Sequence, residues 1–127
     1  MTVVLDTSAL LYWSFSPQSL SPRARQTIEN ARTLLVSSIS LWEIAIKHKQ
    51  QRLHLPLDPA DYAARLLRTA KISIVPVEVQ IWLANVSMAW EHKDPADRTI
   101  VATAQERNCP LVSSDREIRE FYPLAVW

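Results

Sequence analysis

Short apolar runs alternate along the chain with longer segments of helix-like character. The short runs, rich in Val, Ile and Leu, predict strands at residues 3–5, 33–36, 72–76, 110–113 and 124–126. The longer segments predict helices at residues 9–14, 22–32, 40–49, 59–69, 79–89, 95–106 and 115–120. Strands that alternate with helices form a parallel sheet covered on both faces. The pattern therefore predicts an α/β fold with a mostly parallel central sheet.

Four acidic residues lie where a strand-like run gives way to a helix-like one. Asp6 and Asp115 end predicted strands, and Glu43 and Asp97 lie about one turn inside predicted helices. An open α/β sheet brings the carboxyl ends of its strands together in one crevice. We therefore expect the four carboxylates to meet there.

Helix capping explains any one of these acids equally well. Ser40 and Glu43 have the spacing of a capping box, and Ser114 and Glu117 have the same spacing before the last helix. Asp94 before Pro95 has the pattern of an N-cap with proline at the first helical position. Capping gives no reason, however, for four separate junctions to carry one acid each.

Convergence of the four acids would have an electrostatic consequence. Carboxylates within a few ångströms of one another repel and raise each other's pKa values unless a cation joins them. A site made only of oxygen ligands suits Mg²⁺ or Mn²⁺, and Mg²⁺ commonly binds a substrate phosphate as well. The pattern is therefore typical of metal-dependent phosphodiester chemistry.

Composition narrows the classes of function. The 127 residues suit one domain, and no run approaches the about 18 apolar residues of a membrane helix. The start of the chain lacks the basic region of a signal peptide, so we expect a cytoplasmic protein with no membrane partner. The complete absence of glycine disfavours dinucleotide-binding and P-loop motifs, which need glycine beside phosphate.

Charge is balanced overall but clustered locally. The net charge of +1 argues against a globally basic nucleic-acid binder. Basic residues nevertheless follow Glu43, between Lys47 and His54, where they could contact a phosphate backbone or simply solvate a helix face. The lone Cys109 excludes an internal disulfide, and no Cys/His cluster suggests zinc.

Four stretches of the chain resemble the PIN-domain ribonucleases, specifically the VapC-like toxins of type II toxin–antitoxin pairs. They are residues 5–11, 40–47, 94–104 and 111–115. The resemblance covers nearly the whole chain and implies a three-layer α/β/α PIN-like domain over residues 1–127. It also implies an endoribonuclease that depends on Mg²⁺ or Mn²⁺, an RNA substrate, an inhibitory antitoxin protein and a homodimer.

The resemblance assigns roles residue by residue. Asp6, Asp97 and Asp115 would hold one or two metal ions, and Glu43 would complete the site or orient the attacking water. Asp94 is the alternative third acid, or else a helix cap. Further contacts to the acids or the phosphate are expected from Ser8, Ser38, Ser113, Ser114 and Arg98.

Two departures and two alternatives accompany this interpretation. Ser8 stands where many relatives have His, and Gln51 stands where many have Gly. A catalytically silent PIN-like module that binds RNA or protein would share the fold. A phosphotransfer domain of the receiver or haloacid-dehalogenase type would also place Asp at a strand end. The further acid or strand-end Lys that such domains need is not seen.

Overall fold

The computed structural model describes residues 1–127 and is built around a sheet of five strands, all parallel. The strand order across the sheet is β3-β2-β1-β4-β5. The strands are β1 (Thr2–Leu5), β2 (Thr33–Ser37), β3 (Ile72–Val75), β4 (Leu111–Val112) and β5 (Ala125–Val126). This confirms the predicted α/β class, and each predicted strand is present.

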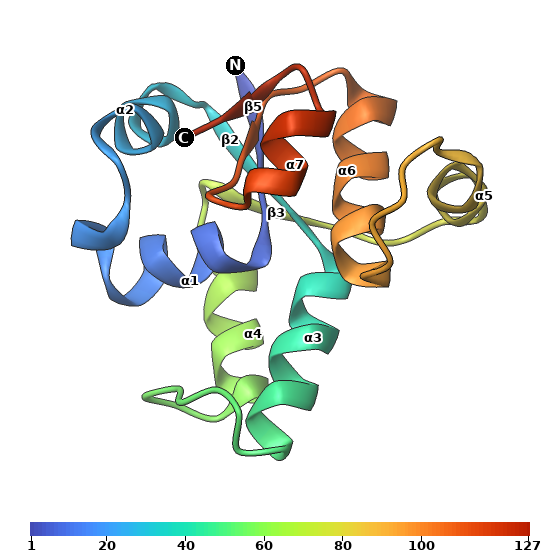
Figure 1. Cartoon of the computed structure of the whole chain (residues 1–127). Coiled ribbons are helices and arrows are strands. Elements are labelled where there is room, and N and C mark those ends of the chain that lie inside the picture. The colour runs from blue at the N-terminus through green and yellow to red at the C-terminus, as the bar shows by residue number, and fades with distance from the viewer.

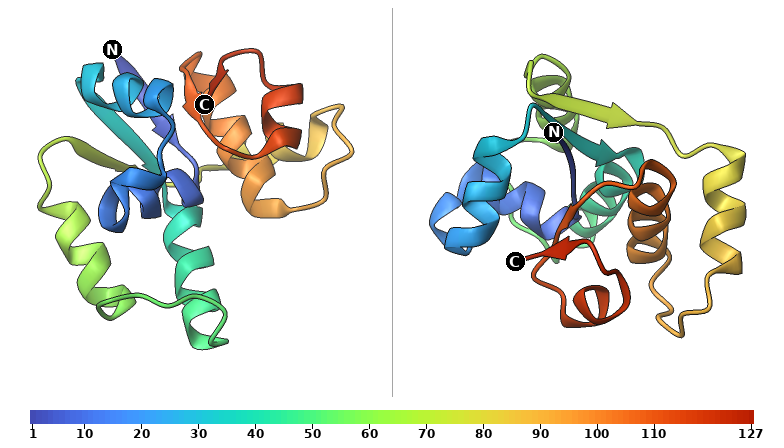
Figure 2. Two further views of the ribbon diagram at one scale, coloured as in Figure 1. Left: turned by 60° about the vertical axis from the view of Figure 1, so that its left-hand side comes forward. Right: turned by 90° about the horizontal axis from the view of Figure 1, so that it is seen from above.

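Helices lie between the strands and cover both faces of the sheet (Figures 1 and 2). They are α1 (Thr7–Phe15), the short 3-10 helix η1 (Pro17–Ser19), α2 (Pro22–Asn30), α3 (Ser38–Lys49), α4 (Pro59–Leu67), α5 (Val79–Ser87), α6 (Pro95–Arg107) and α7 (Arg116–Phe121). The result is the expected three-layer α/β/α arrangement. None of these helices has the length and apolar character needed to cross a membrane.

Two apolar clusters hold the layers together. Along β1, Val3 and Leu5 pack into one cluster with α1, α2 and α4, whereas Val4 packs into the other with α6 and α7. All three side chains are fully buried. Because successive residues of a strand point to opposite faces, burial on both sides produces the uninterrupted apolar runs seen in the sequence.

Two predicted capping boxes are wrong. Helix α3 begins at Ser38 and is capped by Ser37, whose side chain accepts a hydrogen bond from the backbone N–H of Ile39. Ser40 therefore lies inside the helix, fully buried, and accepts a hydrogen bond from the Thr7 hydroxyl at 2.9 Å. Helix α7 is likewise capped by Asp115 itself and not by Ser114. The predicted N-cap role of Asp94, with Pro95 at the first helical position, is confirmed.

The turn after α3 contains a left-handed residue. Gln51, which stands where the resemblance leads one to expect Gly, has a φ of 58°. A positive φ is the conformation that glycine adopts without a steric penalty. The other left-handed residue, Asn108 at the end of α6, has a φ of 50° and is of a type that tolerates this region. The backbone thus makes both turns without glycine.

Candidate metal and phosphodiester site

A polar pocket of about 400 Å³ lies beside the carboxyl ends of β1 and β4. Its walls come from α1, α3, the turn after α3, the start of α6 and the segment after β4. The lining residues are Asp6, Thr7, Ser8, Leu11, Glu43, Ile44, Lys47, Arg52, Leu53, Asp94, Asp97, Ser114 and Asp115. The fold thus brings the acids at the four predicted junctions to one pocket, and Asp94 joins them.

Three of these acids are held by the backbone of the helix that each one precedes. Asp6, Asp94 and Asp115 are the N-caps of α1, α6 and α7. Each uses Oδ1 to accept a backbone N–H, at 2.8 Å for Asp6, 2.9 Å for Asp94 and 3.1 Å for Asp115. In each case Oδ2 accepts no backbone hydrogen bond. Capping and pocket lining are therefore compatible roles, since one oxygen of each carboxylate serves the helix.

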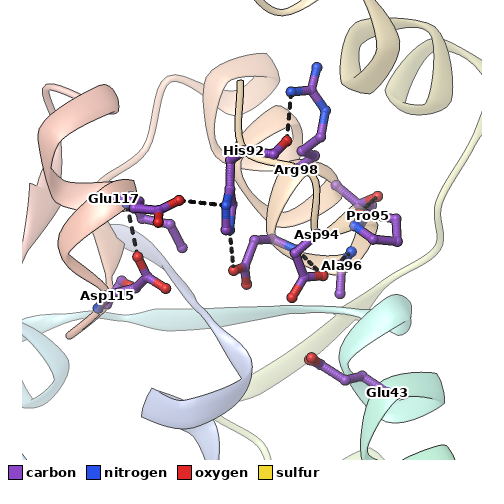
Figure 3. A network of polar contacts seen from close by, with 12 residues as sticks. Glu43, His92, Asp94, Pro95, Ala96, Arg98, Asp115 and Glu117 are labelled. Atoms are coloured by element: carbon purple, nitrogen blue, oxygen red, sulfur yellow. Dashed lines mark hydrogen bonds and ion pairs between the residues drawn. The ribbon is translucent and has the colours of Figure 1, made fainter. Parts of the chain in front are cut away.

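Glu43 reaches the pocket from the middle of α3 (Figure 3). Its Oε2 lies 3.1 Å from Lys47 Nζ, one turn further along the helix. Its Oε1 is buried and has no hydrogen-bond partner. A buried polar atom without a partner costs free energy and is rare in folded proteins. A water molecule, whether free or bound to a cation, would supply the missing partner.

The buried carboxylate of Asp6 shows how strongly the site disfavours uncompensated charge. Burial raises the pKa of Asp6 from 3.8 to about 6, although hydrogen bonds from Ser113 and Ala9 oppose the change. The negative charges of Asp97 and Asp115 raise it further. Together with the unpartnered Glu43 oxygen, these acids form an all-oxygen set that fits Mg²⁺ or Mn²⁺.

His92 bridges two acids at one edge of the site (Figure 3). Its Nε2 lies 2.7 Å from Asp97 Oδ2, and its Nδ1 lies 2.6 Å from Glu117 Oε2. Burial opposes the charged imidazole, but the hydrogen bond and the charges of Asp97, Glu117 and Asp115 prevail and raise the pKa of His92. Burial also raises the pKa of Asp97, with a further increase from Asp94 and Asp115, while the bond to His92 lowers it.

The predicted serines lie in different surroundings. Ser8 and Ser114 line the acidic pocket. Ser113 is buried beneath it and accepts a hydrogen bond from the backbone N–H of Asp115 at 3.1 Å. Ser38 lines a separate, largely apolar cavity and does not line the acidic pocket. The prediction that Ser38 contacts the acids is therefore wrong, because its side chain lines the cavity formed with Trp42 and Trp82 instead.

Arg98 does not face the pocket, and its predicted contact with a phosphate or an acid is also wrong. Its guanidinium donates hydrogen bonds to the backbone carbonyls of Asn85, Met88, Trp90 and His92. These carbonyls belong to the end of α5 and to the segment that follows it. Arg98 therefore fixes the segment that carries His92.

Two features of the site were missed or left open by the sequence. His92 lies in a stretch with neither strand nor helix periodicity, and its only signal is its position two residues before Asp94. Lys47 and Arg52, from the basic stretch after Glu43, line the pocket. They place positive charge on the α3 side of an otherwise acidic site, where it could contact a phosphate.

Comparison with known proteins agrees with this architecture. The family described as PIN domain matches residues 3–123. Ribonuclease VapC22 of Mycobacterium tuberculosis is 36% identical, over 99% of this chain and 98% of that protein.

Solved structures share the fold at low sequence identity. A toxin–antitoxin complex from Klebsiella pneumoniae contains a chain with a TM-score of 0.69 and 19% identity, covering 98% of this chain and 96% of that one. Mycobacterium tuberculosis VapC20, described as a toxin that cleaves the sarcin-ricin loop, has a TM-score of 0.63 and 16% identity over 93% of each chain. The match to the family model, the similarity to VapC22 and the fold together show that the chain belongs to the PIN domain family.

Proposed function

We propose that the protein is a metal-dependent endoribonuclease and the toxin of a toxin–antitoxin pair. The observation on which this rests is the meeting of Asp6, Glu43, Asp97 and Asp115, from four separate segments, in one pocket. The relative VapC22 is named a ribonuclease, which supports RNA as the substrate.

Different side chains of the pocket are assigned different roles in the proposed reaction. Asp6, Asp97 and Asp115 would hold one or two Mg²⁺ or Mn²⁺ ions, and Glu43 would orient the attacking water through its unpartnered Oε1. When bound, such an ion activates water and neutralises charge that develops on the phosphate. Lys47 would bind a neighbouring phosphate of the RNA.

The direct test is cleavage of RNA by the purified chain. Structured and single-stranded RNA would each be incubated with Mn²⁺, with Mg²⁺ or with EDTA. We expect internal cleavage with either metal and none with EDTA. Binding of RNA without cleavage under every condition would instead favour the catalytically silent module.

An inhibitory partner is the second part of the proposal. A nuclease that attacks cellular RNA must be restrained, and an acidic pocket is most simply blocked by a partner that inserts a cation such as arginine. The solved structure from Klebsiella pneumoniae is a toxin–antitoxin complex, which supports a partner of this kind.

Expression in cells tests the toxin assignment. We expect the wild-type chain to arrest growth when expressed alone, and co-expression of the adjacent gene's product to relieve the arrest. Asp6→Asn should be tolerated without that product, because it removes one acid from the pocket. Equal arrest by wild type and by Asp6→Asn, at equal protein levels, would show that toxicity does not depend on the acids.

A homodimer is the third part of the proposal, and α5 offers the surface for it. Val79, Trp82, Leu83 and Val86 of this helix are all exposed. The helix (Val79–Ser87) contains no charged residue. In a two-fold symmetric contact, residues near the axis face their own copies, so an uncharged helix avoids repulsion between like charges. We therefore propose that a second copy of this chain covers the exposed face of α5.

Light scattering on two glutamate variants tests the dimer. We expect wild type to have the mass of a dimer, and Leu83→Glu to raise the dimer dissociation constant at least about tenfold by burying charge at the contact. Leu67→Glu on α4, where the leucine is 72% exposed, is the matched control and should leave the dimer intact. A monomeric wild type, or a dimer insensitive to Leu83→Glu, would exclude this interface.

A further inference from the structure

Asp97 is held differently from the other aspartates of the pocket. Asp6, Asp94 and Asp115 are N-caps, and the backbone of the following helix fixes one oxygen of each. Asp97 is the third residue of α6 and caps nothing. The only hydrogen bond to its carboxylate comes from the imidazole of His92, at 2.7 Å. The orientation of Asp97 therefore depends on another side chain, which a substitution can remove.

His92 is itself fixed in place before any ligand binds. Its ring packs against Trp90 with centroids 4.7 Å apart, and Trp90 stacks on Phe121 at the end of α7 with centroids 4.6 Å apart. Arg98 donates a hydrogen bond to the His92 carbonyl at 3.1 Å. The side chain of His92 is only 17% exposed. Such packing preorganises the imidazole toward Asp97.

The second imidazole nitrogen connects another element to the site. Nδ1 of His92 lies 2.6 Å from Oε2 of Glu117, in the first turn of α7. Asp115, the N-cap of the same helix, lines the pocket. One imidazole therefore ties α6, which carries Asp97, to α7, which is capped by Asp115.

We propose that His92 is a positioning residue for the metal site: it holds Oδ2 of Asp97, leaves Oδ1 available to the pocket, and fixes α7 against α6 through Glu117. This inference rests on the proposed metal-dependent function. His92 also lies close enough to Asp94 and Asp97 to be considered a ligand itself. Because both of its ring nitrogens are engaged by carboxylate oxygens, neither offers a lone pair to a metal, and the positioning role fits better.

Two substitutions separate positioning from packing. His92→Phe retains a ring against Trp90 but has no nitrogen, whereas His92→Gln loses the ring but retains a donor for Asp97. Mn²⁺ affinity would be measured by titration calorimetry without RNA, alongside kcat and KM for RNA cleavage and the melting temperature of each metal-free protein.

We expect His92→Phe to weaken Mn²⁺ binding about 10- to 100-fold, the range found for residues that orient metal ligands, and to lower kcat at a fixed metal concentration. The KM for RNA should change less than about twofold, because the RNA contacts are not touched. His92→Gln should recover most of the Mn²⁺ affinity. Glu117→Gln is the matched control: it keeps an oxygen that accepts a hydrogen bond from Nδ1 and removes only the charge of a side chain that is 63% exposed, so it should change the Mn²⁺ affinity less than about threefold.

Wild-type Mn²⁺ affinity in His92→Phe would overturn the positioning role while leaving the proposed nuclease intact. Equal loss of Mn²⁺ affinity in the Phe and Gln variants, with an equal fall in melting temperature, would reduce His92 to a packing residue. If His92→Phe does not fold, the Gln variant decides alone, and failure to bind Mn²⁺ better than Asp97→Asn contradicts the proposal. A wild-type protein that binds no Mn²⁺ would refute both the positioning role and the metal-dependent function.

Discussion

Asp6→Asn is expected to abolish RNA cleavage and at the same time to make the metal-free protein more stable near neutral pH. Cleavage should fall at least about 100-fold, because an acid proposed to hold the metal is lost. Stability should rise because Asp6 is only 4% exposed and the pKa of its carboxyl group in the fold is about 6, against 3.8 when unperturbed. A raised pKa in the folded state means that ionised Asp6 destabilises the fold.

The stabilisation by Asp6→Asn should grow as the pH rises. Below 3.8 Asp6 is protonated in both the folded and the unfolded chain, so its ionisation costs nothing. The cost grows as pH rises from 3.8 to about 6 and is complete above that, where it amounts to about 3 kcal/mol at most. Asparagine has the same shape, caps a helix as well as aspartate does, and cannot ionise.

Thermal melts in EDTA at several pH values test this expectation. Asp6→Asn should melt above wild type near neutral pH, and the difference should shrink as pH falls below about 6. Added Mn²⁺ should raise the melting temperature of wild type much more than that of the variant. A variant less stable than wild type in EDTA near neutral pH would contradict the description of Asp6 as a strained, buried charge.

Asp97→Asn should lower the cleavage activity but not the stability of the fold, whereas Asp94→Ala should lower the stability but not the activity. Both acids line the pocket, but Asp94 is the N-cap of α6 and accepts its backbone N–H groups at 2.9 Å and 3.4 Å. Asp97 caps no helix, so Asp97→Asn should reduce cleavage about 100-fold with little change in the free energy of unfolding. Asp94→Ala should instead lower the free energy of unfolding by about 0.5–2 kcal/mol and leave most of the activity.

Asp94→Asn is the matched control, because it keeps the cap and removes only the charge. It should unfold like wild type and retain most of the cleavage activity. Chemical denaturation and initial cleavage rates, measured on all three variants, give both quantities. Loss of activity in Asp94→Asn with activity retained in Asp97→Asn would transfer the proposed metal role from Asp97 to Asp94.

The periodicity of the sequence was sufficient to predict the order of strands and helices along the chain. Val3, Val4 and Leu5 form an unbroken apolar run because β1 is covered on both faces, and this pattern is typical of a parallel sheet between helices. The meeting of Asp6 and Asp115 was also expected from the sequence, because both residues lie at the carboxyl ends of predicted parallel strands. The structure adds that these two strands, β1 and β4, are neighbours in the sheet.

Contacts made by irregular segments could not be predicted in the same way. His92 reaches Asp97 from a connection without periodicity, and the partners that fix it, Trp90, Phe121 and Arg98, become neighbours only in the folded chain. The orientation of Arg98 was missed for a related reason. A guanidinium next to an acid in the sequence is equally able to bind backbone carbonyls, and the end of α5 offers several at close range.

Diffraction from crystals soaked in Mn²⁺, recorded at a wavelength where manganese scatters anomalously, tests the central proposal most directly. The proposal predicts an anomalous peak in the pocket of Asp6, Glu43, Asp97 and Asp115, with carboxylate oxygens of at least two of them about 2.1 Å away. The same soak of Asp6→Asn should show a weaker peak or none. A pocket without an anomalous peak in wild type, at Mn²⁺ concentrations that support RNA cleavage, would contradict a metal site formed by these acids.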